Sequence, residues 1–276
     1  MSGLAASDRS VQPSSGLSRF GAMVGKELLE LVRSLKLIWV PIVFIALGIM
    51  QPVTSYYMPV ILEKAGSLPD GAVIDIPLPS GAQVMAETLA QFGSLGALVI
   101  VLVFMGTVSS ERNSGAVSMI LVKPVSPASY LISKWGAMLL LSSLSLLAGY
   151  SAAWYYTRFL IEAVAFKAVL SSFLLYELWL LVLLTLTLLL STALRSAAGA
   201  AFAALGAGAI LSLLSNLFPK YAGWLPGALP GFARQAVMGS LEWSSRFGAC
   251  LGATVLLLAA LVLLANILLR RAAAID

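Results

Sequence analysis

Apolar positions along this chain come in long runs rather than in short alternating stretches. Six runs are about as long as the 20 residues that a helix needs to cross the hydrocarbon core of a bilayer. The predicted spans are residues 37–58, 89–110, 131–153, 170–194, 197–218 and 247–269. The pattern therefore predicts an all-α integral membrane protein, with residues 37–271 forming one domain of six transmembrane helices.

Residues 17–36 follow a different pattern, in which apolar side chains recur at intervals of three and four. These are Leu17, Phe20, Val24, Leu28, Leu31 and Leu35. One apolar helical face predicts a cytoplasmic amphipathic helix lying along the membrane surface before the first span. Such a helix can anchor the chain, contact another protein, or do both. Residues 1–16 are small and polar and are predicted to form a flexible N-terminal tail.

Composition strengthens the membrane assignment and gives it an orientation. Of the 276 residues, 60% are hydrophobic and only 11% are charged, and the mean hydropathy is +0.96. The net charge of +5 is more typical of a topology signal than of nucleic-acid binding. With a cytoplasmic N-terminus, 11 of the lysines and arginines fall in inside segments and 6 in outside segments. An even number of spans then leaves both termini in the cytoplasm.

Missing residue types exclude several classes of chemistry. The chain has no histidine, which removes HExxH metalloprotease sites, Ser-His dyads and histidine proton relays. One cysteine, Cys250, cannot form an intrachain disulfide and reads as a small buried apolar residue. Gly21–Glu27 resembles a phosphate-binding loop but has three residues between the glycines and Glu27 after the lysine. We therefore expect no metal site, bound cofactor or nucleotide site in this chain.

Two segments on the outer side are predicted to differ from each other. Residues 59–88 contain four acidic residues and four prolines, which indicates a turn-rich loop. Residues 219–246 mix aromatic residues with prolines and glycines. They are too apolar for a solvated loop and too broken for a span, so a short helical excursion at the membrane interface is expected.

Few residues within the spans carry chemistry. Small residues in the fifth span and the Gly248–Gly252 pair in the sixth predict close helix packing, within the chain or against another subunit. Glu177 lies near the outer end of the fourth span. It is a possible intramembrane polar site, because a carboxylate there is costly, although an interfacial carboxylate is an equal alternative.

The cytoplasmic segment between the second and third spans, residues 109–134, is predicted to be a rigid helical elbow. Ser109 or Ser110 is a candidate N-cap, with Glu111 in the first turn. Pro124 ends a short helix. Ser126 and Pro127 then start the helix that continues into the third span. Met119, Ile120 and Leu121 have no lipid to cover there, so the elbow is predicted to dock onto a partner.

At these residues the chain resembles the ABC-2 type permeases, the membrane subunits of ATP-binding-cassette exporters. The segment ERNSGAVSMILVKPVSPASYLISK is similar to the family block E-R-x-x-G-[TS]-L-E…P-V-S…K. The segment KELLELVRSLKLIWVPIVF resembles the family's amphipathic connecting helix. The matching residues of the block are Glu111, Arg112, Gly115, Pro124, Val125, Ser126 and Lys134. Ser118 and Pro127 stand where the family has an acidic residue and an arginine.

The resemblance implies a function that the residues alone do not supply. In that family the elbow is a coupling helix seated in a groove of a separate ATPase, which binds ATP and Mg²⁺. The implied partners are two ATPase subunits, a second permease subunit, identical or paralogous, and the bilayer of a bacterial plasma membrane. The residues expected to dock the ATPase are Glu111, Arg112, Gly115, Met119, Ile120 and Leu121, helped by Lys26 and Glu27.

Two other functions compete with this reading. An ion- or proton-coupled secondary transporter needs paired ionisable residues at mid-membrane and internal repeats, whereas the spans offer Glu177 and no convincing repeat. A membrane enzyme is disfavoured by the missing histidines.

Overall fold

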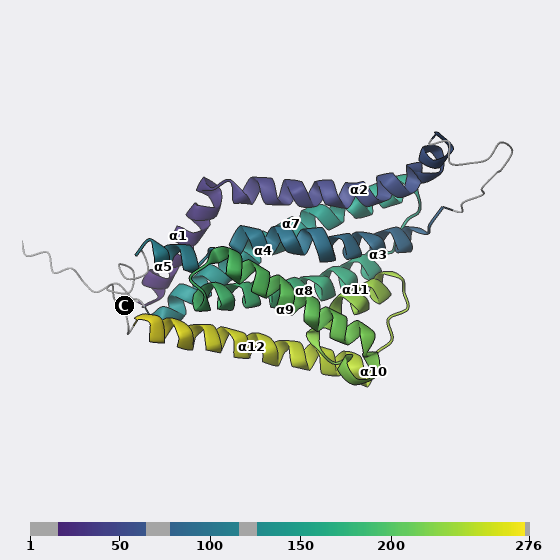
Figure 1. Ribbon diagram of the computed structural model, residues 1–276. Helices are drawn as coiled ribbons and strands as arrows, with labels where there is room; N and C mark the ends of the chain where they lie inside the picture. The colour runs from purple at the N-terminus through teal and green to yellow at the C-terminus, as the bar shows by residue number, and fades with distance from the viewer. Residues whose placement is uncertain (1–15, 65–77, 116–125, 274–276) are drawn as a thin grey trace, which may run out of the picture.

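The computed structural model describes residues 16–64, 78–115 and 126–273 as a bundle of helices that run along one long axis (Figure 1). Six helical segments in these ranges are long and apolar enough to cross a membrane, which confirms the predicted fold class. They are α2 (Lys36–Lys64), the composite of α3 (Gly81–Gln91), η1 (Phe92–Gly96), α4 (Ala97–Phe104) and α5 (Ser109–Asn113), then α7 (Pro127–Leu160), α8 (Phe166–Ala193), α9 (Ala197–Leu217) and α12 (Ser245–Ala273).

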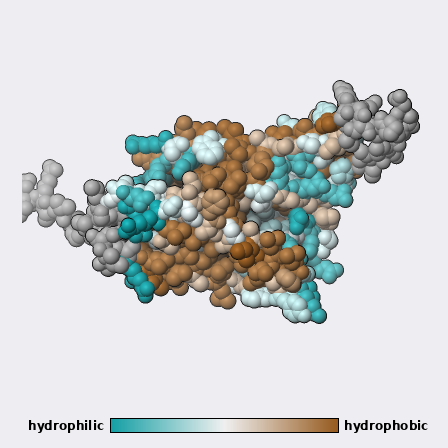
Figure 2. All heavy atoms as spheres, in the orientation of Figure 1, coloured by the Kyte–Doolittle hydropathy of each residue, from teal (hydrophilic) through white to brown (hydrophobic). Residues whose placement is uncertain are grey.

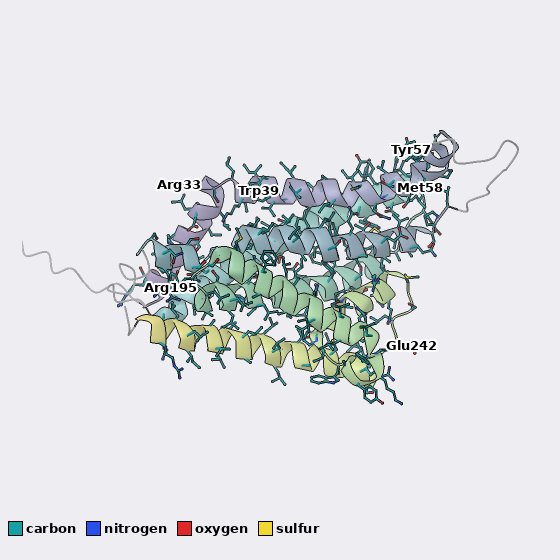
Figure 3. The ribbon with its side chains drawn as sticks, viewed as in Figure 1. Arg33, Trp39, Tyr57, Met58, Arg195 and Glu242 are labelled. Carbon is teal, nitrogen blue, oxygen red and sulfur yellow. The ribbon has the colours of Figure 1, made fainter. Side chains whose placement is uncertain are left out.

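The two ends of the bundle carry different elements. Helix α1 (Gly16–Arg33) lies at the same end as α5 and the C-terminal end of α12 (Figure 1). We call this the α1 end. The opposite end, the α11 end, carries α10 (Pro219–Ala222), η2 (Pro226–Ala228) and α11 (Leu229–Val237). In Figure 3, Arg33 and Arg195 mark the α1 end, and Glu242 marks the α11 end.

The outer surface of the bundle fits a bilayer. Figure 2 shows a hydrophobic band across the middle of the molecule, with hydrophilic residues gathered toward both ends. Trp39 and Tyr57, both exposed, lie near opposite ends of α2 (Figure 3). At 1.5 Å per residue the 18 steps between them span about 27 Å, close to the hydrocarbon thickness of about 30 Å. Aromatic side chains are enriched at these two interfaces.

Helix α2 packs against α7 through a contact between backbones. A Cβ atom on Gly48 would collide with the carbonyl of Gly149, and one on Gly149 would collide with the backbone of Phe44. Absence of a side chain at both glycines therefore lets the two helices approach closely. Phe44 then stacks on Phe92 of η1 at 5.3 Å between ring centroids. The result is a buried aromatic layer that also includes Tyr176 of α8.

The second span starts earlier than the sequence pattern predicts. Ser80 accepts a hydrogen bond from the amide of Gln83, and the Gln83 side chain accepts one from the amide of Ser80, a capping box that starts α3 at Gly81. Because α2 also continues to Lys64, the predicted outer loop at 59–88 is too long at both ends. Polar residues in Gly81–Gln91 masked a helix that buries one of its faces.

The chain bends sharply between α1 and α2. Leu35, expected on the apolar face of the amphipathic helix, instead lies in the turn with φ of 56°. A left-handed conformation is unfavourable for any residue with a Cβ atom. At this strained turn α1 ends and the chain enters the first span. Pro41, Pro52 and Pro59 lie inside α2, and the helix continues through all three.

Candidate functional site

The elbow at the α1 end begins with α5, which is bonded to the corner between α8 and α9. The amides of Val108 and Ser109 both donate to Oγ of Ser191, at 3.0 and 3.1 Å. Arg112 donates to the carbonyl oxygen of Thr192 at 2.8 Å, and Asn113 donates to that of Arg195 at 2.9 Å. The amides at the start of α5 and the carbonyl oxygens at the end of α8 have no partner within their own helices, and these bonds supply one. Helix α5 is thereby fixed to the end of the fourth span.

On its other side α5 joins a cluster of charged groups contributed by three helices. Glu111 of α5 accepts from Nζ of Lys26 of α1 at 2.7 Å and from Nζ of Lys134 of α7 at 2.9 Å. Lys134 also donates to both carboxylate oxygens of Glu27, each at 3.1 Å. The hydroxyl of Tyr130 donates to the second oxygen of Glu111. We call Lys26, Glu27, Glu111, Tyr130 and Lys134 the elbow cluster.

Most of the elbow cluster is withdrawn from solvent. The side chain of Lys134 is 1% exposed and that of Glu27 is 6% exposed, whereas that of Lys26 is 41% exposed. Two ammonium groups alternate with two carboxylates, so each buried charge has neighbours of opposite sign. Burial by itself lowers the pKa of Lys26, but hydrogen bonds to Glu111 and Glu27 and their charges outweigh it and raise this pKa above its ordinary value. The cluster is therefore charged at neutral pH on the Lys26 side.

Three carboxylates near the cluster come close enough to hold a cation. Oxygen atoms of Glu27, Glu30 and Glu111 lie within 4.8 Å of one another. Lys26 contacts all three, with Glu30 at 3.8 Å. Because Lys26 and Lys134 already form ion pairs with these carboxylates, the arrangement is that of an ion-pair network linking α1 to α5 and α7.

The structure brings together four of the residues predicted to dock a partner, and turns most of their polar groups inward. Glu111 and Glu27 bond to Lys134, Arg112 bonds to the end of α8, and Lys26 bonds to both carboxylates. Gly115 has φ of 73°. Such a conformation favours glycine, so this residue sets the direction in which the chain leaves α5. The remaining candidates lie outside the described residues: Met119, Ile120 and Leu121.

The capping predictions for the elbow have mixed outcomes. Ser126 is the N-cap of α7, accepting from the amide of Ser129 at 3.1 Å, with Pro127 at the first helical position, as predicted. The prediction that Ser109 or Ser110 caps the preceding helix is wrong. Both lie inside α5. The N-cap is Val108, which offers no side-chain acceptor, and Ser191 of α8 accepts the hydrogen bonds that a capping side chain would accept. A cap supplied from α8 leaves no local pattern in the sequence.

Lys134 and Tyr130 complete the elbow cluster. Lys134 was matched to the family block without a predicted contact, and Tyr130 was not singled out. Lys134 falls near the predicted start of the third span, where a lysine reads as an interfacial residue. The spacing of four residues between Tyr130 and Lys134 does indicate that the two side chains share one face of a helix. The facing carboxylate of Glu27, 107 positions earlier, could not be read from that pattern.

Glu177 stands apart from the elbow cluster. Its Oε1 accepts from the hydroxyl of Ser143 on α7 at 2.7 Å. Its Oε2 is buried and has no partner among the described residues. None of the ion pairs between described residues involves Glu177. A paired ionisable network of the kind that ion-coupled transport needs is not formed by this residue within the described part of the chain.

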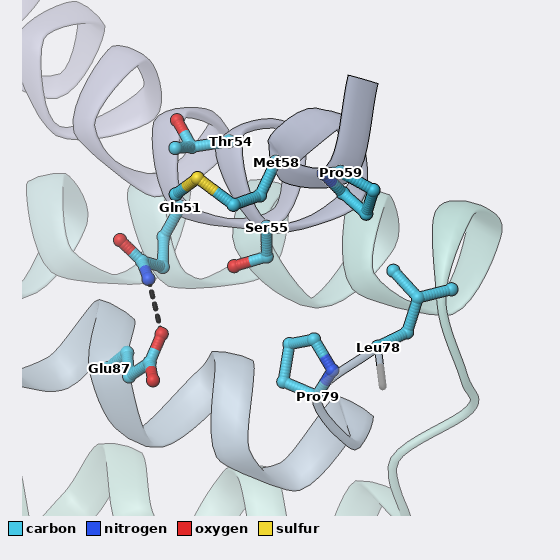
Figure 4. A pocket seen from close by; sticks show the side chains of 8 residues that line it. All are labelled: Gln51, Thr54, Ser55, Met58, Pro59, Leu78, Pro79 and Glu87. Carbon is cyan, nitrogen blue, oxygen red and sulfur yellow. Dashed lines mark hydrogen bonds between the residues drawn. The ribbon is translucent and has the colours of Figure 1, made fainter. Parts of the chain in front are cut away.

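A small cavity of about 170 Å³ lies at the other end of the molecule, between α2 and α3 (Figure 4). Gln51 donates from its side-chain amide to Glu87 across it. Met58, Pro59, Leu78 and Pro79 form much of the remaining wall. The hydrogen bond from Gln51 holds the Glu87 carboxylate toward α2.

Comparisons with known proteins agree with this architecture. A family model described as ABC-2 family transporter protein matches residues 22–243, which is more than half of the chain. The match includes the elbow cluster and five of the six spans. The uncharacterized transmembrane protein YxlG of Bacillus subtilis (strain 168) is 42% identical to this chain over 208 residues. That alignment covers 75% of this chain and 81% of the relative.

Proposed function

Because the chain belongs to the ABC-2 family of transporter membrane proteins, we propose that it is the permease subunit of an exporter driven by separate ATPase subunits. Those subunits bind ATP and Mg²⁺ and hydrolyse the nucleotide, and this chain forms the route through the plasma membrane. The observation that carries the proposal is the anchored elbow, a segment between two spans that is bonded to three other elements at one end of the bundle.

The distribution of charge supports a cytoplasmic location for the α1 end. Both α1 and the C-terminal end of α12 lie there. Arg33 and Arg195 lie at this end (Figure 3), and Arg270 and Arg271 are in the last turn of α12. Segments rich in lysine and arginine stay on the cytoplasmic side of a membrane. The elbow then faces the compartment that contains ATP, and both termini lie in the same compartment.

The elbow is suited to transmit movement because its contacts run to separate spans. A displacement of α5 acts on α8 and α9 through Ser191 and the carbonyls that Arg112 and Asn113 bind. It acts on α7 through Lys134 and on α1 through Lys26. In this proposal Glu111, Arg112, Lys26 and Glu27 hold the docking segment in position, and residues 115–121 contact the ATPase.

Export requires a route that six helices rarely enclose alone. We therefore place the route at a seam with a second permease subunit, so that two permease chains and two ATPase chains form the transporter. Closure of the two ATPases would move both elbows together, in the manner of coupled domain movements that alternate access to a site.

The test is a pair of charge substitutions in the docking segment. Met119→Glu and Leu121→Glu should abolish copurification of the chain with an ABC ATPase of the same organism, and should separate ATP hydrolysis from export. Met238→Glu, at an exposed position of the α11 end outside the spans, is the matched control and should leave copurification unchanged. All variants should insert in the membrane to the same extent. Full binding and transport by Met119→Glu and Leu121→Glu would refute the proposed docking.

A further inference from the structure

A large apolar groove at the α11 end has no role in the elbow or in ATPase docking. It has a volume of about 720 Å³ and lies between the composite second span and α9, with Trp179 and Leu183 of α8 among its lining residues. This volume falls within the range of about 300–1,000 Å³ that is typical of small-molecule sites. Apart from Pro230 and Arg234 of α11, its lining residues belong to membrane-spanning helices, so acyl chains of the surrounding bilayer lie within reach of it.

The groove exists because the second span and α9 pack at one end and separate toward the other. Val101 of α4 packs against Ala201 and Ala204 in the half of α9 nearer the α1 end. Beyond this contact the second span changes to the π-helix η1, an insertion that is frequent at functional sites. Gly93 of η1 and Ala209 of α9 line opposite walls. Small residues on both walls leave the space empty of side chains.

The groove has a polar mouth. Asn216 of α9 and Arg234 of α11 line both the apolar groove and a neighbouring cavity of about 530 Å³. Arg234 is exposed and has no ion-pair partner among the described residues. Glu87, which also lines the neighbouring cavity, is held by Gln51 on its other side. An arginine that lacks a carboxylate partner is a strong binding group for phosphate, because its planar donors match phosphate oxygens.

An apolar groove whose mouth holds a cation without an ion-pair partner among the described residues matches an anionic amphiphile. We propose that the groove binds an acyl chain of a phospholipid taken from the leaflet at the α11 end, with its phosphate bound by Arg234. Charge complementarity favours this occupant over a second copy of the chain, whose exposed span faces are apolar and would leave Arg234 unpaired. The proposal concerns binding by this chain alone and does not depend on the ATPase.

Native mass spectrometry of the purified chain in detergent tests the proposal, with phosphatidylglycerol as the probe. Arg234→Gln should weaken binding of this lipid by about tenfold or more, because hydrogen bonds between charged groups are the stronger ones. Ala209→Phe should fill the groove and abolish binding. Diacylglycerol, which has chains but no phosphate, should bind wild type as weakly as phosphatidylglycerol binds Arg234→Gln. Inorganic phosphate alone should not bind.

Two controls separate the site from general effects on the protein. Arg158→Gln removes an exposed arginine that lines none of the cavities described, and Gly206→Leu adds a side chain to α9 where no atom lies within 4 Å. Both should bind phosphatidylglycerol like wild type. Gly93→Leu fills the groove from the opposite wall and should also abolish binding. It replaces Ala209→Phe in the test if that variant does not fold.

Equal binding of phosphatidylglycerol by wild type and Arg234→Gln would overturn the proposal. So would loss of a dimer, rather than loss of lipid, in Ala209→Phe, since the occupant would then be a second copy of the chain. Copurification with the ATPase does not depend on phosphatidylglycerol binding. Failure of this proposal is therefore distinguishable from failure of the proposed function.

Discussion

Removing the buried ammonium group of Lys134 should destabilise the protein more than any other single charge removal in the elbow cluster. Lys134 is 1% exposed and donates to three carboxylate oxygens, two on Glu27 and one on Glu111. Lys134→Met keeps the length of the side chain but leaves two negative charges facing each other with only Lys26 between them. Removal of one partner from a buried ion pair costs about 3–5 kcal/mol.

The double variant tests the cause of that loss. Adding Glu27→Gln to Lys134→Met removes the carboxylate left without its main partner and should recover at least half of the lost stability. Independent effects would instead add. Lys167→Met removes an exposed lysine without a described ion pair and should change nothing.

The chain supplies its own reporter for this measurement. Cys250 is its one cysteine and is buried, so a thiol-reactive fluorophore labels it as the bundle unfolds with heating in detergent. Lys134→Met should label at a clearly lower temperature than wild type, with the double variant between them. Unfolding of Lys134→Met at the wild-type temperature would show that the elbow cluster contributes nothing to the fold, and would refute the reasoning.

Three further substitutions test other contacts by the same labelling measurement. Gly48→Leu should destabilise by about 3 kcal/mol, the upper end for overpacking, because the Gly149 backbone cannot move aside. Gly248→Leu, where no neighbouring atom lies within 4 Å, should be neutral, and equal effects would contradict the α2–α7 contact. Ser191→Ala should cost about 1–3 kcal/mol, because two buried amides of the elbow lose their acceptor; an unchanged unfolding temperature would show that the amides find another. Leu35→Gly should stabilise by about 1 kcal/mol, because it relieves a left-handed turn; a loss of stability would mean that the leucine side chain holds the bend.

The sequence pattern predicts the spans well because the bilayer imposes a length and a composition on each. Ala197–Leu217 was predicted within one residue, and the tight turn at Arg195 is present with Ser196 as the N-cap of α9. The predicted start of the second span is too late because the first turns of α3 contain polar residues, among them Gln83 of the capping box with Ser80. Hydropathy reports the lipid-facing residues and says less about a helix end that is buried by its neighbours.

Helix contacts were harder to predict than helices. Gly248 and Gly252 have the spacing typical of close packing, yet a Cβ atom on either would meet nothing within 4 Å in this chain. Gly208 does pack, against Leu183 of α8. The close approach of the α2 and α7 backbones uses Gly48 and Gly149, which have no local motif. Which small residue faces a neighbour depends on how the helices are rotated, and a single sequence does not contain that rotation.

The residues predicted to dock a partner include four that lie close together in the structure, in a geometry that the sequence does not show. Glu111, Arg112, Lys26 and Glu27 were all singled out, and the structure places them together. Their polar groups bond within the chain, because Lys134, Ser191 and the α8 carbonyls supply partners. Charge patterns along one helix cannot identify partners that lie on another.

Site-specific crosslinking of the elbow tests the central claim most directly. Replacing Cys250 with serine allows one cysteine to be placed at Leu121, or at Met238 of the α11 end as a control. With an ABC ATPase of the same organism coexpressed, Leu121→Cys should form a crosslink to the ATPase that changes in yield when nucleotide is added, and Met238→Cys should form none. An ATPase crosslink at Met238, or none at Leu121 while that cysteine reacts freely with a soluble maleimide, would contradict the account.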